Sequence, residues 1–287
     1  MSKSIETVVV LGAGTMGRGI AQNAAAVKCR VLLLDADLER ARAGRDAIDA
    51  TLTKLVAKER ITREEHDRVL ARIEASDDRA DAVSDADVIV EAAPEKMELK
   101  QSIFAGLATE APKRALLGSN TSSLSISEMA KGCGAEDRVI GLHFFNPVPV
   151  MKLLEIVRGE STSDETIARA QEFATLLGKD AILVKDSPGF ATSRLGVLLG
   201  LEAMRMVQEG VASAGDIDKA MELGYRHPMG PLKLTDLVGL DVRMAIADHL
   251  HNELGSASFE VPDILREKVA AGELGRKSGK GFYDYDA

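Results

Sequence analysis

The stretch VVVLGAGTMGRGIAQ, residues 8–22, decides the fold of this chain. An apolar run rich in valine is followed by Gly12, Gly14 and Gly17 in the spacing G-x-G-x-x-G. The run is typical of a buried parallel strand, and the glycines predict a tight turn into a helix that begins near Thr15. The N-terminus of such a helix presents unpaired N–H groups to an anion. The stretch therefore predicts the first strand, turn and helix of a nucleotide-binding α/β domain.

The next apolar run, RVLLLD, ends in Asp35. An acid at the end of the second strand, about 20 residues after the first glycine, is placed to hydrogen-bond the adenosine ribose of a dinucleotide. Asp35 would repel a 2′-phosphate, and no arginine follows it directly, so the pattern favours NAD over NADP. The alternative is a glycine turn in an α/β domain that binds no nucleotide. The expected cofactor contacts are Gly12, Ala13, Gly14, Thr15, Met16, Gly17 and Asp35.

Strand and helix patterns alternate through the first two thirds of the chain. Further strand-like runs are DVIVEAAP, ALLGSNTS, RVIGLHFFN, KLLEIVRG and AILVKD, with helical patterns at 96–110 and around 164–177. Residues 37–71 form a long charged helical pattern with a break near Ile61 and Thr62, which predicts a helical hairpin that projects from the sheet. The rhythm predicts a Rossmann-like, mostly parallel sheet with this hairpin as an insertion.

The rhythm changes after residues 185–189. Only helical patterns follow, at 192–209, 214–223, 232–254 and 262–271. We therefore expect two domains, an NAD-binding domain over residues 1–185 and an all-α domain over residues 186–287.

Composition excludes several classes of protein. The 287 residues carry a net charge of −9, which argues against a protein that binds nucleic acid or an anionic membrane. No uninterrupted apolar run reaches the roughly 18 residues of a membrane-spanning helix. The two cysteines, Cys29 and Cys133, form no disulfide framework, and the N-terminus lacks a secretory pattern, so we expect a cytoplasmic protein. His227 has no metal-ligand partner at a useful spacing, and no metal site is expected.

The candidate catalytic residues lie in GLHFFNPVPVMKLLEIV, residues 141–157. His143 belongs to a first apolar run and Glu155 to a second, joined by a turn at residues 146–149. We interpret His143 as a general acid and base, because its unperturbed pKa lies near working pH, and Glu155 as the carboxylate that orients it. The alternative is a histidine that only satisfies its hydrogen bonds in a core. Ser122, at a strand-to-helix turn, either donates to a substrate oxygen or caps a helix that begins near Ser125.

Seven stretches resemble one family, the L-3-hydroxyacyl-CoA dehydrogenases, whose bacterial branch is the 3-hydroxybutyryl-CoA dehydrogenases. They keep their order over nearly the whole chain: LGAGTMGRGIA, VEAAPE, SNTSSL, GLHFFNPVPVMKLLEIV, KDSPGF, GYRHPMGPLKLTDLVGLD and KSGKGFYDY. The resemblance implies oxidation of (S)-3-hydroxyacyl-CoA by NAD⁺ to 3-oxoacyl-CoA, in a cleft between a Rossmann-like domain and a helical domain that forms a homodimer. It leaves the pathway open among fatty-acid β-oxidation, butanoate or polyhydroxybutyrate metabolism and aromatic degradation.

The resemblance also implies roles for single residues. It makes His143 the catalytic histidine and Glu155 its partner, and it makes Ser122 a contact for substrate and cofactor. It places contacts with NAD at Glu95, Lys100 and Lys277, a contact with both NAD and the substrate at Asn146, and contacts with CoA at Thr51 and Lys58. Glu91 and Glu95 have the alternative of being solvated acids at a strand end.

Lys54 and Lys58 lie one helical turn apart. We interpret both as partners of the CoA phosphates through charge-assisted contacts, with a solvated helix face as the alternative. The run PGFATSRLG departs from the family, which often carries asparagine where this chain has Ser193. Because that position lies close to the reacting oxygen in the family, Ser193 joins the candidate catalytic residues, with a shorter reach.

Three other functions stay open. One is a dehydrogenase of a free hydroxy acid or sugar acid, such as L-gulonate, which would keep the His–Glu pair and lose the CoA-contacting lysines. Another is a β-hydroxyacid dehydrogenase with a catalytic lysine between the domains, disfavoured by Arg194 and by the absence of lysine between Ser187 and Gly210. The third is an NAD-binding protein without turnover.

Overall fold

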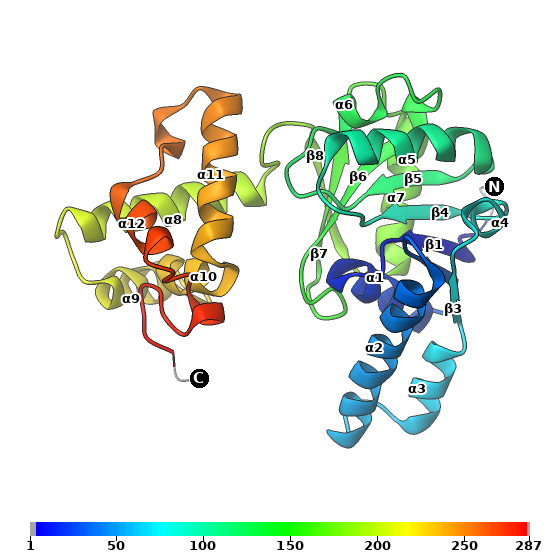
Figure 1. Cartoon of the computed structure of the whole chain (residues 1–287), viewed down its shortest axis with the longest axis horizontal. Helices are drawn as coiled ribbons and strands as arrows, with labels where there is room; N and C mark the ends of the chain where they lie inside the picture. Colours follow the sequence, from blue (N-terminus) through cyan, green and yellow to red (C-terminus); the bar gives the residue numbers. More distant parts are fainter. Residues whose placement is uncertain (1–3, 286–287) are drawn as a thin grey trace. The chain divides into compact units, whose positions relative to one another are not determined.

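The computed structural model describes residues 4–285, and the chain divides into two compact units, Met1–Asp186 and Ser187–Ala287. The first unit contains the β-sheet and the second is built from helices (Figure 1).

An eight-stranded sheet in the order β3-β2-β1-β4-β5-β6-β7-β8 organises the first unit. Its strands are β1 (Thr7–Leu11), β2 (Arg30–Leu34), β3 (Ile73–Ser76), β4 (Val88–Glu91), β5 (Leu116–Ser119), β6 (Val139–Phe144), β7 (Leu153–Arg158) and β8 (Asp180–Lys185). All neighbours are parallel except β6 and β7, so the predicted mostly parallel sheet is confirmed. The order of the strands reverses between β1 and β4, where open sheets of this kind bind their ligands.

Strand β3 was not predicted. Its sequence, IEAS, is short and half polar, and Glu74 is exposed. It becomes a strand because its backbone pairs with β2, with Ile73 opposite Val31. The short helix α4 (Arg79–Val83) follows it and was missed as well.

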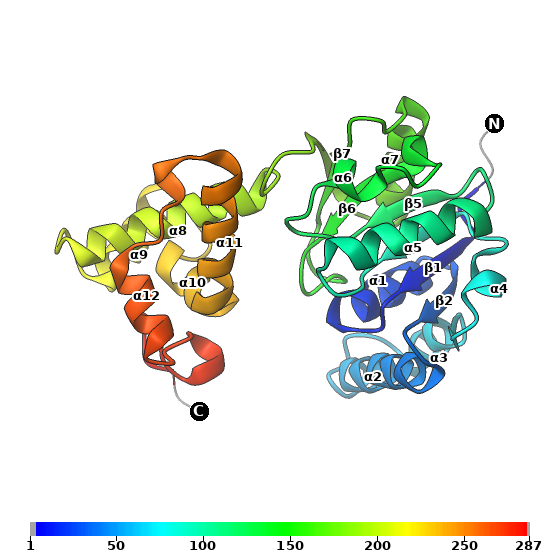
Figure 2. The ribbon, with the colours of Figure 1, turned by 45° about the horizontal axis from the view of Figure 1, so that its top comes forward.

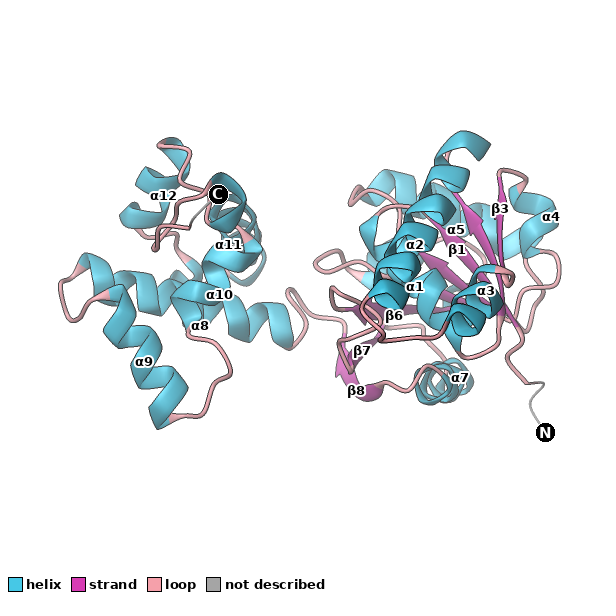
Figure 3. Ribbon diagram, turned by 90° about the horizontal axis from the view of Figure 1, so that it is seen from below, coloured by secondary structure: helices cyan, strands magenta, loops and turns pink. Residues whose placement is uncertain are grey.

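Helices lie around the sheet, and the pair α2 and α3 projects from it (Figures 1, 2 and 3). They are α1 (Thr15–Ala26), α2 (Leu38–Ala57), α3 (Arg63–Leu70), α5 (Met97–Glu110), α6 (Ile126–Ala130) and α7 (Asp164–Leu176). Every residue of β1 is buried, as expected for a parallel strand covered on both faces.

The predicted helical hairpin is confirmed as α2 and α3. Thr62 and Glu65 form a reciprocal capping box that starts α3 after the break. The ring of His66 is 1% exposed and bridges the hairpin, with Nε2 2.7 Å from Oδ1 of Asp49 and Nδ1 2.9 Å from Oδ1 of Asp67.

The second unit packs α8 (Thr192–Gln208), α9 (Ala214–Gly224), α10 (Pro231–Val238), α11 (Leu240–Leu254) and α12 (Asp263–Ala270) around its own apolar core. The single helix expected over 232–254 is wrong, because Gly239 separates α10 from α11. Its φ of 108° is a conformation that glycine adopts far more readily than other residues. Within residues 4–285, no helix combines the length and apolar character needed to cross a bilayer.

Candidate active site

The three glycines of the first turn have different surroundings. A Cβ on Gly12, whose φ is 111°, would lie 2.5 Å from the carbonyl oxygen of Ala92. A Cβ on Gly17 would lie 1.7 Å from the carbonyl oxygen of Gly12, whereas one on Gly14 would meet nothing within 4 Å. Gly12 and Gly17 therefore permit close packing, and Gly14 leaves open space before α1. Gly14 is the N-cap of α1 and offers no side-chain cap, so the first-turn N–H groups suit a pyrophosphate.

Asp35 lies beside this turn at the end of β2. Its Oδ2 accepts the N–H of Ala13 at 2.7 Å and its Oδ1 accepts the N–H of Ala36 at 2.8 Å. A carboxylate has about four lone-pair positions, so acceptors remain for the hydroxyls of a ribose. The glycine turn and Asp35 together have the groups and the open space that the ADP half of NAD requires.

A buried ion pair supports the ends of β4 and β5. Lys100, 1% exposed, places Nζ 2.6 Å from Oε1 of Glu91 and 3.2 Å from Oε2 of Glu95. Glu91 is fully buried, and its Oε2 also accepts the hydroxyl of Ser119 at 2.6 Å. For Glu91 the solvated-acid alternative is wrong. Glu91 was not among the predicted site residues, although an acid at the end of a parallel strand is a usable signal.

Glu95 connects this ion pair to the loop that carries Ser122. Its Oε1 accepts the backbone N–H of Ser122 at 3.1 Å and the hydroxyl of Thr121 at 2.5 Å. Ser122 does not cap α6, because Ser125 is the N-cap and accepts the N–H of Glu128 at 3.2 Å. No hydrogen bond joins the Ser122 hydroxyl to another residue within 4–285, so this hydroxyl is available to a ligand.

His143 and Glu155 lie directly opposite each other in the antiparallel pair β6–β7. Nδ1 of His143 is 2.6 Å from Oε2 of Glu155, whose side chain is fully buried, and the histidine is 7% exposed. An ionised carboxylate only accepts hydrogen bonds, so an ionised Glu155 selects the tautomer in which Nδ1 carries the proton and Nε2 can take one. The ring of Phe145 packs against the imidazole with centroids 4.5 Å apart.

A cavity of about 490 Å³ joins α1, α2 and the loop after β6. Four of the predicted ligand contacts line it: Thr15, expected to contact the cofactor, and Thr51, Lys54 and Asn146. Its charged lining residues are Lys54 and Arg18, and no acid lines it, although the protein carries a net charge of −9. The cavity therefore favours an anion. Arg18 was not predicted, because it lies inside the glycine motif, whose signal comes from the backbone and not from this side chain.

Three predicted residues lie elsewhere. Lys58 is the C-cap of α2, is exposed, and is not among the residues that line the cavity. Ser193 lies in the first turn of α8. Lys277 pairs with Asp241, its Nζ 2.5 Å and 2.6 Å from the two carboxylate oxygens. This bond from Lys277 lowers the pKa of Asp241.

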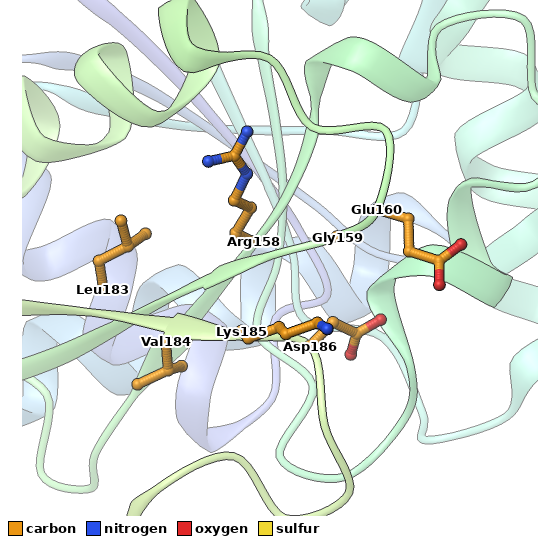
Figure 4. Close-up of a pocket in the computed structure, with 7 residues that line it drawn as sticks. All are labelled: Arg158, Gly159, Glu160, Leu183, Val184, Lys185 and Asp186. Carbon is orange, nitrogen blue, oxygen red and sulfur yellow. The ribbon is translucent and has the colours of Figure 1, made fainter.

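A hollow of about 530 Å³ lies beside the ends of β7 and β8, lined by Arg158, Glu160, Lys185 and Asp186 among others (Figure 4). Arg158 is at the end of β7 that lies toward Val139, away from His143. The hollow contains none of the predicted site residues. Among residues 4–285, no group of three or more His, Cys, Asp or Glu is arranged to hold a metal ion.

Comparison with known proteins agrees with this geometry. Residues 7–187 match the family model "3-hydroxyacyl-CoA dehydrogenase, NAD binding domain", and residues 189–285 match "3-hydroxyacyl-CoA dehydrogenase, C-terminal domain". The 3-hydroxybutyryl-CoA dehydrogenase of Mycobacterium tuberculosis is 42% identical over 287 residues, covering 99% of this chain and 100% of the relative. The 3-hydroxyadipyl-CoA dehydrogenase of Escherichia coli is 40% identical over 288 residues, covering all of this chain and 60% of the relative.

A solved structure shows the same fold. The crystal structure of (S)-3-hydroxybutyryl-CoA dehydrogenase from Ralstonia eutropha superimposes with a TM-score of 0.93 at 41% identity, covering 99% of this chain and 100% of that one. The predicted family and the predicted cofactor, NAD, are confirmed. The chain belongs to the 3-hydroxyacyl-CoA dehydrogenase family and is an NAD-dependent oxidoreductase.

Proposed function

We propose that the protein oxidises short-chain (S)-3-hydroxyacyl-CoA thioesters, 3-hydroxybutyryl-CoA foremost, to 3-oxoacyl-CoA. The observation that carries the proposal is the His143–Glu155 pair, 2.6 Å apart, in the same sheet as the glycine turn. The relatives named for 3-hydroxybutyryl-CoA support the short acyl chain.

Nε2 of His143 removes the proton of the substrate hydroxyl. Glu155 keeps Nδ1 protonated and stabilises the imidazolium that forms, and a positioned general base of this kind contributes about 10²–10⁴-fold in rate. NAD⁺, when bound, supplies the acceptor for the hydride that leaves C3. Ser122 donates its hydroxyl to the substrate oxygen, with Ser193 as a second donor. In the reverse direction His143 returns the proton to that oxygen.

The cavity between α1 and α2 favours a CoA thioester over a free hydroxy acid. CoA carries a 3′-phosphate and a pyrophosphate, whereas a free hydroxy acid carries neither. Arg18 and Lys54 supply two positive charges to this cavity, and Thr51 and Asn146 supply polar groups. We assign the phosphates to these residues, with Lys58 as an outer contact one turn further along α2.

Lys277 and Glu95 complete the proposed NAD contacts, and the buried Lys100 supports them through its ion pair with Glu95. We also propose that the protein is a cytoplasmic homodimer. We propose that the interface lies on the second unit, which exposes large apolar side chains of a kind that subunit interfaces cover. These side chains are Leu195, Val211, Leu223, Tyr225, Leu237, Val238 and Val242.

The test is the consumption of NADH with acetoacetyl-CoA, with free acetoacetate and NADPH as parallel controls. We expect turnover only with acetoacetyl-CoA and NADH. Turnover of free acetoacetate at a comparable rate would favour the free-acid function. NADH binding without turnover of any substrate would favour the non-catalytic one.

A further inference from the structure

One buried lysine of the first unit belongs to none of the sites above. Lys179 lies between α7 and β8 and is 8% exposed. Its Nζ donates to the carbonyl oxygens of Val148 at 2.5 Å and Met151 at 2.8 Å. Its partners among residues 4–285 are carbonyl oxygens and not carboxylates, and burial lowers the pKa of Lys179. Burying an ammonium group without a counter-ion is unfavourable, so these two carbonyl groups are what hold it in place.

Both carbonyls belong to the loop of residues 145–152, which joins β6 to β7. Pro147 and Pro149 have no N–H, so the loop has few donors of its own. The carbonyl of Pro147 accepts the N–H groups of Val150 and Met151 at 2.9 Å and 3.0 Å. Lys179 adds the two donors that the carbonyls of Val148 and Met151 require.

The same loop forms one wall of the cavity. Residues 146–150 line it together with Arg18 and Lys54, whereas Lys179 does not line it. On α1, a Cβ added to Gly19 would lie 2.9 Å from Cβ of Val148, whose side chain is 2% exposed. The loop is therefore held from two sides, by the close approach of Val148 to Gly19 and by the ammonium of Lys179.

We propose that Lys179 is a positioning residue for the substrate: it fixes the loop of residues 145–152 so that residues 146–150 keep the shape of the cavity wall against which the CoA thioester binds. His143 and Glu155 depend on it less, because the β6–β7 ladder holds them in register. This role of Lys179 rests on the proposed function, which supplies the CoA thioester as substrate. It predicts that loss of Lys179 changes KM more than kcat.

The decisive variant is Lys179→Met, which keeps the length of the side chain and removes its donors. Losing two hydrogen bonds from a charged donor raises the KM for acetoacetyl-CoA by about tenfold or more. We expect kcat and its pH profile to stay within about twofold of wild type, because the base is held elsewhere. Lys179→Arg, which restores donors, should recover much of the KM. Lys152→Met, an exposed lysine of the same loop, is the matched control and should behave as wild type.

A KM at the wild-type value in folded Lys179→Met would overturn the proposal. The proposal would also be overturned if kcat fell in proportion to the unfolded fraction of the variant while KM stayed unchanged. That result is the signature of a purely structural role. If Lys179→Met does not fold, amide hydrogen exchange of the wild-type protein tests instead whether the loop of residues 145–152 is fixed. The amides of Val150 and Met151 should then be protected like those of β7, and rapid exchange there would contradict a fixed loop. Absence of acetoacetyl-CoA turnover in the wild type would refute the proposed function, while the exchange measurement would still test the loop.

Discussion

Nδ1 of His143 lies 2.6 Å from Oε2 of Glu155, across the only antiparallel pair in the sheet of residues 4–186. The two residues occupy the same register position, so the strand ladder itself sets their separation. Glu155 is fully buried, and in the proposed function it orients His143 through Nδ1 while Nε2 exchanges a proton with the substrate.

His143→Gln should remove the base while keeping a side chain of similar size. We expect kcat to fall by about 10²–10⁴-fold, with NADH still bound. Glu155→Gln should also lower kcat, because an amide can donate to Nδ1 and so favours the wrong tautomer. Steady-state kinetics with acetoacetyl-CoA and fluorescence titration with NADH measure the two effects. Turnover of His143→Gln near the wild-type rate would exclude His143 as the base.

Asp35→Ala should weaken the binding of NADH and reduce the preference for NADH over NADPH. A hydrogen bond to a charged acceptor contributes about 1.5–3 kcal/mol, so the KM for NADH should rise at least about tenfold. Asp37→Ala is the matched control, because Asp37 caps α2 through the N–H of Arg40 and has no predicted role in binding. If both variants shifted the cofactor constants equally, Asp35 would have no special role.

Arg18→Met and Lys54→Met should each raise the KM for acetoacetyl-CoA by about tenfold, since each removes a charge-assisted contact. Acetoacetyl-pantetheine, which lacks the nucleotide phosphates, should show no such loss. Arg42→Met, an exposed arginine of α2 outside the cavity lining, serves as the control. If Arg18→Met raised the KM for NADH and left the KM for acetoacetyl-CoA unchanged, Arg18 would be assigned to the cofactor instead.

Lys100→Met should destabilise the first unit, because it leaves the fully buried Glu91 without its cation. Breaking a buried pair from one side costs about 3–5 kcal/mol in the free energy of unfolding. Urea denaturation measures this, and adding Glu91→Leu to the variant should restore part of the loss. If Lys100→Met were as stable as wild type, the ion pair of Lys100 and Glu91 would contribute nothing to the stability of the fold.

The second unit should contain an acid-sensitive contact at Glu273. Hydrogen bonds from Lys268, and then from Lys280, lower the pKa of its carboxyl to about 2. A lowered pKa means that the stabilisation is complete above the ordinary value of 4.5 and is lost as the pH falls toward about 2. The difference in Tm between wild type and Glu273→Gln should therefore shrink over this range. Glu267→Gln, an exposed acid of α12, should show no such trend.

Local signals predicted much of this molecule. The glycine spacing and Asp35 lie within one strand–turn–helix–strand unit, where backbone geometry and short-range hydrogen bonds dominate. The missed features depend on partners distant in the chain: β3 exists through its pairing with β2, and α10 ends at a conformation of Gly239 that an apolar periodicity does not encode.

The sequence by itself determined the class of the fold, the cofactor and the identity of the candidate base. It could do so because the conformation of a turn and the burial of a strand depend mainly on residues that are neighbours in the chain. Only the tertiary structure decided that Glu91 is buried on Lys100, that Arg18 and Lys54 share one cavity, and that Lys179 holds the loop after β6. The physical reason is that burial and the choice of a charge partner depend on which distant segments pack together. Lys179 and Val148 lie far apart in the chain, and packing alone brings the ammonium to its carbonyl.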